Sequence, residues 1–236
     1  MHSGYDFHPP HFGRERLNAR ACITRHRHWN GYITVVLGGR YQEAGLDGRR
    51  DLAAGDVVVH RRFDAHLDCV GPNGAELINL PLPPGSSLPT AFRVEDPDRV
   101  ARLAESDPAT AARTLRPDGA VAIQSDWPDR LALLLTAPNQ QRLGQWADSI
   151  GLAAETLSRG FRAAYGITPA RFRAEARARR AMEMILATET SLASVAIDCG
   201  YSDQPHLSRA IVELTGRSPG HWRRSNPFKK DERTPA

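Results

Sequence analysis

The chain has 236 residues, enough for two modest domains, and 41% of them are apolar, so each domain can bury a core. Residues 138–236 hold 15 Lys and Arg against 10 Asp and Glu, whereas residues 1–137 hold 16 against 17, which concentrates the positive charge in the C-terminal part. Because residues 1–10 do not resemble a secretion signal and no apolar stretch is long enough for a membrane span, we expect a cytoplasmic protein without a membrane partner.

The N-terminal part alternates short β-branched runs with glycine. The runs are 32–37, 56–60 and 75–80, and glycine-rich segments at 38–39 and 71–74 separate them as turns. Closely spaced strands with such turns indicate a small barrel or sandwich. Together with His26-Arg27-His28 and the stretch 55–66, this pattern resembles the cupin-type sensor domain. The resemblance implies a cupin-like β-barrel at residues 1–90 with a small-molecule pocket inside it.

Four histidines of this region are candidate metal ligands, and they are His26, His28, His60 and His66. His26 and His28 stand two positions apart on a strand, so both side chains would point to one face. Enzymatic cupins hold a metal with such a pair, a carboxylate a few residues later and a distal histidine. Residues 29–33 contain no carboxylate, so we expect hydrogen-bonded histidines, no metal, no cofactor and no catalytic residues. A metal-dependent cupin enzyme with an accessory helical domain is the alternative.

The segment 91–137 is expected to be a helical linker. Asp96-Pro97 and Asp107-Pro108 each look like an N-cap followed by a helix-starting proline, and an apolar run at 131–135 follows Trp127-Pro128. These helices either pack on the barrel or pair two subunits as a homodimer.

The three cysteines are Cys22, Cys69 and Cys199, an odd number without CxxC spacing. Such usage fits a reducing compartment, and buried unreactive thiols are the expected state. A redox switch between Cys22 and Cys69 is the alternative.

The last hundred residues contain one pattern twice. Residues 146–173 and 195–223 share Ala, Gly, Leu-Ser-Arg, Gly, Pro and Arg at matching positions, and the second copy has one extra residue before Leu207. Each copy reads as two short helices joined by a tight turn at a glycine, which is a helix-turn-helix unit. Between the copies, residues 170–187 lack Gly and Pro and predict one helix of roughly 25 Å. Such a rod would hold the two units about 34 Å apart, one turn of duplex.

The second helix of each copy has two faces. Leu157 and Phe161, like Leu207 and Ile211, recur at helical spacing and should pack inward. The opposite face carries the candidate base-reading residues, which are Glu155, Ser158, Arg159 and Arg162 in the first copy and Gln204, Pro205, Ser208 and Arg209 in the second. Arg pairs bidentately with guanine, Gln with adenine, and Ser with several groups on base edges. With the local excess of positive charge, these side chains predict DNA as the partner.

Residues from about 143 to 224 resemble the DNA-binding domain of the AraC/XylS family of bacterial transcription regulators, most specifically over 195–209 and 216–223. One departure is Ala153, which stands where a capping Ser is common. The resemblance implies that base readers lie at Glu155, Ser158, Arg159, Gln204, Ser208 and Arg209. The expected fold is α+β with two domains, the second an all-α double helix-turn-helix domain at 138–226 before a disordered tail at 227–236.

The function implied is that of a sequence-specific transcription regulator, expected to be an activator. Its two recognition helices would read adjacent major grooves of double-stranded promoter DNA, with RNA polymerase as a further partner. A small-molecule effector in the N-terminal domain would control it, although no residue identifies that effector. An architectural DNA binder without regulation is a further alternative, because it needs only the helical domain.

Overall fold

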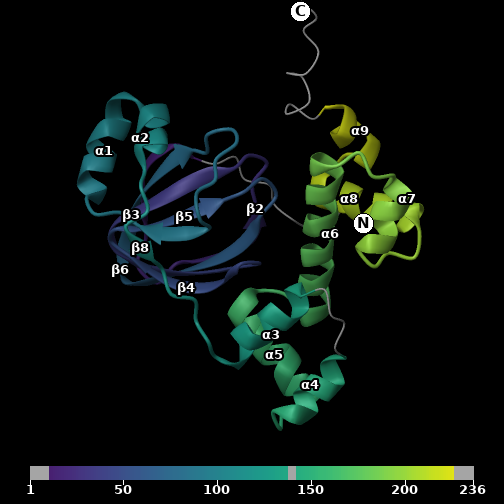
Figure 1. Cartoon of the computed structure of the whole chain (residues 1–236). Coiled ribbons are helices and arrows are strands. Elements are labelled where there is room, and N and C mark those ends of the chain that lie inside the picture. The colour runs from purple at the N-terminus through teal and green to yellow at the C-terminus, as the bar shows by residue number, and fades with distance from the viewer. Residues whose placement is uncertain (1–10, 138–141, 226–236) are drawn as a thin grey trace, which may run out of the picture. The chain divides into compact units, whose positions relative to one another are not determined.

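The computed structural model describes residues 11–137 and 142–225, and these form two compact units. The sheet unit comprises 11–137 with 142–169, and the helical unit comprises 170–225. Figure 1 shows a β-sheet in the sheet unit and only helices in the helical unit, so the predicted α+β class is confirmed. The predicted disordered tail at 227–236 lies outside the described residues. No helix of the described ranges is long and apolar enough to cross a membrane.

One antiparallel sheet forms the framework of the sheet unit. Its strands are β1 (Gly13–Leu17), β2 (Cys22–Arg27), β3 (Tyr32–Gly45), β4 (Gly48–Ala53), β5 (Asp56–His60), β6 (Ala65–Pro81), β7 (Ala91–Arg93) and β8 (Gly119–Ala120). The hydrogen-bonded order is β1-β6-β3-β5-β7-β8, with β2 paired to β6 and β4 to β3. Among the described residues the two end strands, β1 and β8, do not pair. The predicted barrel is therefore wrong in one respect, because the sheet is not closed.

The glycine-rich segments predicted as turns lie inside the two longest strands. Both 38–39 and 71–74 belong to continuous strands, β3 and β6, which pair with each other along most of their length with register shifts near the glycines. Gly39 has a φ of +70°, and a Cβ at this position would overlap the carbonyl oxygen of Gly74. The glycines therefore let the two paired backbones approach closely and shift register without ending the strands. As a result, β3 continues to Glu43, which matters below.

Helices α1 (Pro97–Ser106) and α2 (Pro108–Thr114) cover part of the sheet. Ile33, Val57 and Leu80 of the sheet form one core with Ala101 and Ala111 of these helices. Both helices begin as predicted, because the side chains of the aspartates before the two prolines accept hydrogen bonds from backbone N–H groups of the first turn. The segment 91–137 is not purely helical, since it also supplies β7 and β8.

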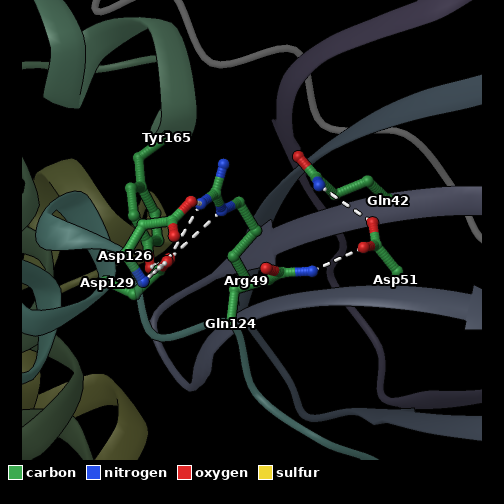
Figure 2. A network of polar contacts seen from close by, with 7 residues as sticks. All are labelled: Gln42, Arg49, Asp51, Gln124, Asp126, Asp129 and Tyr165. Carbon is green, nitrogen blue, oxygen red and sulfur yellow. Dashed lines mark hydrogen bonds and ion pairs between the residues drawn. The ribbon is translucent and has the colours of Figure 1, made fainter.

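The remaining helices of the sheet unit are α3 (Trp127–Thr136), α4 (Leu143–Ser149) and α5 (Ala154–Tyr165). Leu131 and Leu135 of α3 are buried, so the apolar run serves the core of this chain, and Leu133 is 57% exposed. A polar network ties α3 and α5 to strand β4 (Figure 2). The Arg49 guanidinium donates to both carboxylate oxygens of Asp129 at 3.1 and 2.9 Å, and the Tyr165 hydroxyl donates to the same carboxylate at 2.8 Å.

The helical unit contains α6 (Pro169–Ala187), α7 (Leu192–Asp198), α8 (Gln204–Thr215) and α9 (Pro219–Arg224). The prediction of one helix over 170–187 is confirmed, since α6 has 19 residues and a length of about 28 Å. Val195, Leu207 and Ile211 are fully buried and form the core between α7 and α8.

The cysteines correct one expectation. Cys199 is buried as predicted, but Cys22 is exposed and lies directly opposite Cys69 in the pairing of β2 with β6. Their Sγ atoms are 3.0 Å apart. Burial and the hydrogen bond to Cys22 raise the pKa of Cys69 to about 11, so this thiol stays protonated at neutral pH.

Candidate functional site

Two helix-turn-helix units stand at the predicted positions, formed by α4 with α5 and by α7 with α8. The turn glycines, Gly151 and Gly200, have φ values of +69° and +74°, which fits the tight turn predicted at a glycine in each copy. Each second helix ends at a left-handed glycine, Gly166 in the first unit and Gly216 in the second. The two copies therefore correspond in three dimensions at the same residues that correspond in sequence.

The two faces predicted for each second helix are confirmed. Leu157, Phe161, Leu207 and Ile211 are buried. The candidate base-reading residues lie on the other face, where Glu155, Arg159, Arg162, Gln204, Pro205 and Arg209 are exposed and Ser158 and Ser208 are half-buried. Each helix thus has a buried apolar face and a face that exposes most of the candidate residues.

The N-termini of α5 and α8 differ in their capping. The Asp203 carboxylate accepts a hydrogen bond from the His206 backbone N–H at 2.7 Å, whereas Ala153 offers no side-chain acceptor to α5. Asp203 is therefore the N-cap of α8.

Asp203→Ala should lower the free energy of unfolding of the helical unit by about 1 kcal/mol, because it removes the cap. Ala153→Ser should have the opposite effect on the sheet unit, since it supplies the missing acceptor to α5. Urea denaturation of both variants checks this pair, and an unchanged stability of Asp203→Ala would show that water replaces the cap.

The last residue of the second helix has a different structural role in each helix-turn-helix unit. Tyr165 and Thr215 occupy equivalent last positions of α5 and α8. The Thr215 hydroxyl accepts from the Trp222 indole N–H at 2.7 Å and so holds α9 against α8. The Tyr165 hydroxyl donates to Asp129 of α3, and this hydrogen bond anchors the first helix-turn-helix unit to the sheet (Figure 2). Neither role follows from a motif.

A polar cavity of about 280 Å³ lies within the sheet unit. Its lining includes all four candidate histidines, together with Tyr32, Tyr41, Glu43 and Asp68. The expectation that His26 and His28 share a face is confirmed, and His60 and His66 join them. Sequence reasoning missed Glu43, because the carboxylate was sought within a few residues of His28. A sequence signal for Glu43 did exist, because Glu43 lies two positions after Tyr41 on the same strand, and residues two apart on a strand share a face.

The histidine side chains are close enough to interact directly. The Tyr32 hydroxyl lies 3.1 Å from His28 Nε2 and 3.4 Å from His66 Nε2. Glu43 Oε2 lies 3.6 Å from His60 Nε2, and Asp68 Oδ2 lies 3.6 Å from His66 Nε2. Within residues 11–137 and 142–225, two overlapping groups have the proximity required of metal ligands, namely His26 with His28 and His66, and Glu43 with His60 and His66.

Burial favours the neutral form of four ionisable side chains in the cavity lining, which are Glu43, His60, His66 and Asp68. It lowers the pKa of His60 and His66 below the usual value, and neighbouring histidines lower it further. Burial also raises the pKa of Asp68, and it raises that of Glu43 to about 8 although Arg50 opposes the shift. Ionisable groups held neutral in a cavity cost stability, which is typical of binding sites.

Glu43→Gln should stabilise the metal-free protein at pH 8 and change it little at pH 4.5. The carboxyl titrates near 4.5 when unfolded and near 8 when folded, so its contribution to stability falls as the pH rises between these values. A neutral amide has no such dependence and still accepts from Tyr41. Urea midpoints of both proteins in a chelator, at three pH values, measure the difference, and parallel curves would contradict the raised pKa.

Comparison with known proteins identifies the helix-turn-helix region. A family model described as a helix-turn-helix domain matches residues 146–225. No curated protein sequence matches the chain. Similar solved structures include the C-terminal domain of AraT, a response regulator from Geobacillus stearothermophilus, with 25% identity over 43% of this chain and 86% of that one and a TM-score of 0.40.

Two further structures are similar at lower identity. Fatty-acid-bound ToxT from Vibrio cholerae is 9% identical over 92% of this chain and 95% of that one, with a TM-score of 0.43. A regulator with an AraC-type DNA-binding domain from Chromobacterium violaceum is 23% identical over 42% of this chain and 90% of that one, with a TM-score of 0.39. These likenesses are too low to support the assignment, which rests on the match at 146–225 and on the duplicated helices. Residues 146–225 therefore carry a helix-turn-helix domain in which the motif occurs twice.

Proposed function

We propose that α5 and α8 are two recognition helices that read adjacent major grooves of promoter DNA. The observation that carries this proposal is the pair of equivalent polar faces, with Arg159 and Arg209 exposed at matching positions over matching buried residues. Arg at such a place can pair bidentately with guanine, and neighbouring Ser and Gln can read other base edges. The length of α6, about 28 Å, suits a spacer between two readers one helical turn apart.

Selection of bound fragments from randomised duplex DNA tests this proposal. The expected result is two short conserved blocks about ten base pairs apart, because two recognition helices read neighbouring turns. A single block would mean that only one helix reads bases. Fragments without any shared sequence would favour the architectural alternative, in which the domain binds DNA without specificity.

We further propose that the cavity of the sheet unit binds the small effector that controls DNA binding. A physical route exists within this unit, because β2 ends at the cavity and also touches the recognition helix α5. The Arg25 guanidinium, on the residue before His26, donates to the carbonyl oxygens of Ala44 and Tyr165 at 3.1 and 3.4 Å. A ligand that moves β2 would therefore move the C-terminal end of α5. We also propose that the protein activates transcription through RNA polymerase, that it forms a homodimer and that it acts in the cytoplasm.

A further inference from the structure

Glu43, His60 and His66 come from three different strands and meet at the cavity. Each offers one ligand atom, and the three atoms lie within 4.8 Å of one another. All three residues are at least nine-tenths buried. Ligands about 2.0 to 2.2 Å from a tetrahedral ion are about 3.3 to 3.6 Å apart, and Glu43 Oε2 already lies 3.6 Å from His60 Nε2. Only a small movement would bring the set to a coordinating geometry.

The chemistry of the set suits a transition-metal cation. Two imidazoles and one carboxylate are ligands that first-row divalent ions such as Zn²⁺ and Fe²⁺ accept. The carboxylate also supplies the negative charge that a cation needs when it leaves water for a buried cavity. Neighbouring groups can orient the ligands, because the Tyr41 hydroxyl donates to Glu43 at 3.3 Å and Asp68 lies beside His66. His66 Nδ1 is buried and has no hydrogen-bond partner.

The other candidate group, His26 with His28 and His66, is less suitable. The Tyr32 hydroxyl lies at hydrogen-bond distance from both His28 Nε2 and His66 Nε2, at 3.1 and 3.4 Å. That group also lacks a carboxylate to balance the charge of the ion. The two groups therefore make different predictions for single substitutions.

We propose that Glu43, His60 and His66 form a binding site for a first-row divalent cation, and that this cation is the effector of the cavity. The effector role of the cation rests on the function proposed above, in which the cavity controls DNA binding through β2 and α5.

Cobalt titration of the metal-depleted full chain tests the site, because Co²⁺ bound to such ligands absorbs visible light and Zn²⁺ should displace it. We expect one equivalent to bind, and Glu43→Gln to lower the affinity at least tenfold and by a much larger factor than His28→Gln. Urea midpoints of each variant separate lost ligation from lost folding. Absence of saturable binding, or a loss in His28→Gln as large as in Glu43→Gln, would overturn the site.

A second measurement tests the effector role and keeps the two proposals apart. The affinity of the full chain for its selected duplex is measured after metal depletion and again with Zn²⁺, in parallel for the wild type and Glu43→Gln. We expect a change of at least fivefold in the wild type only. Metal binding without a change in DNA affinity would overturn the effector role. Specific DNA binding with no metal binding would overturn the site and leave the proposed function standing.

Discussion

Asp129→Ala should destabilise the sheet unit by about 3 to 5 kcal/mol, the largest stability effect that we expect from one substitution. Asp129 is 1% exposed, and its carboxylate accepts from Arg49 and Tyr165 (Figure 2). Burial alone would lower the pKa of Arg49, but hydrogen bonds to Asp129 and Asp126 raise it. Removing the carboxylate leaves a largely buried guanidinium without its main counter-charge and a buried hydroxyl without its acceptor.

The destabilisation should be centred on β4, α3 and α5, because the Asp129 carboxylate on α3 has its side-chain partners on β4 and α5. Hydrogen exchange should show lost protection in α3 and α5, while α7 and α8 of the helical unit keep theirs. Asp126→Asn is the matched control, since this carboxylate is 70% exposed and its pairing with Arg49 should contribute at most about 1 kcal/mol. Equal losses in both variants would contradict the importance of burial. Uniform loss of protection across both units would contradict the local effect.

Arg209→Ala should weaken binding to the preferred duplex by about 1 to 3 kcal/mol, roughly 5- to 150-fold, and relax discrimination at one base position. Arg209 is exposed on α8, between half-buried Ser208 and the buried Ile211. A planar guanidinium can make two hydrogen bonds to guanine, which an ammonium cannot reproduce in the same geometry. Arg209→Lys should therefore lose most of the specificity while keeping the charge.

Binding to matched and mismatched duplexes over a range of salt concentrations separates the two possible roles of Arg209. A base contact changes specificity and leaves the salt dependence nearly constant. A phosphate contact lowers affinity for all duplexes alike and reduces the salt slope by about 1. Arg217→Ala is the control for the loss of one exposed positive charge, since Arg217 is exposed just beyond the end of α8 and is not one of the candidate base-reading residues. If Arg209→Ala behaves like a phosphate contact, the assignment of Arg209 as a base reader is wrong.

The helical region was predictable because its determinants are local in sequence. Positive φ at Gly151 and Gly200, the cap at Asp203 and the alternation of buried and exposed positions along α8 all arise from residues within a few turns of one another. The same applies to α6, whose composition predicts a helix without reference to any partner. Duplication strengthened the interpretation, because each feature was found twice.

The sheet was predicted less well because glycine occurs both in turns that end strands and in bends within continuous strands. At 38–39 and 71–74 it was interpreted as a turn, whereas the backbone conformation depends on which segment lies across from it. Once β3 and β6 pair, the close approach of Gly39 to Gly74 favours a bend within a continuous strand. That pairing is between residues far apart in the chain, so no local pattern reveals it.

The amino-acid order alone was sufficient for two helix-turn-helix units, their exposed faces and the four histidines of one domain. Long-range contacts decided the rest. The bend in β3 brings Glu43 to His60 and His66, and the Asp129 carboxylate joins Arg49 to Tyr165, 116 positions later in the chain. Such pairings depend on the packing of whole strands and helices, whose energies are summed over many residues, and for that reason they become visible only in the folded molecule.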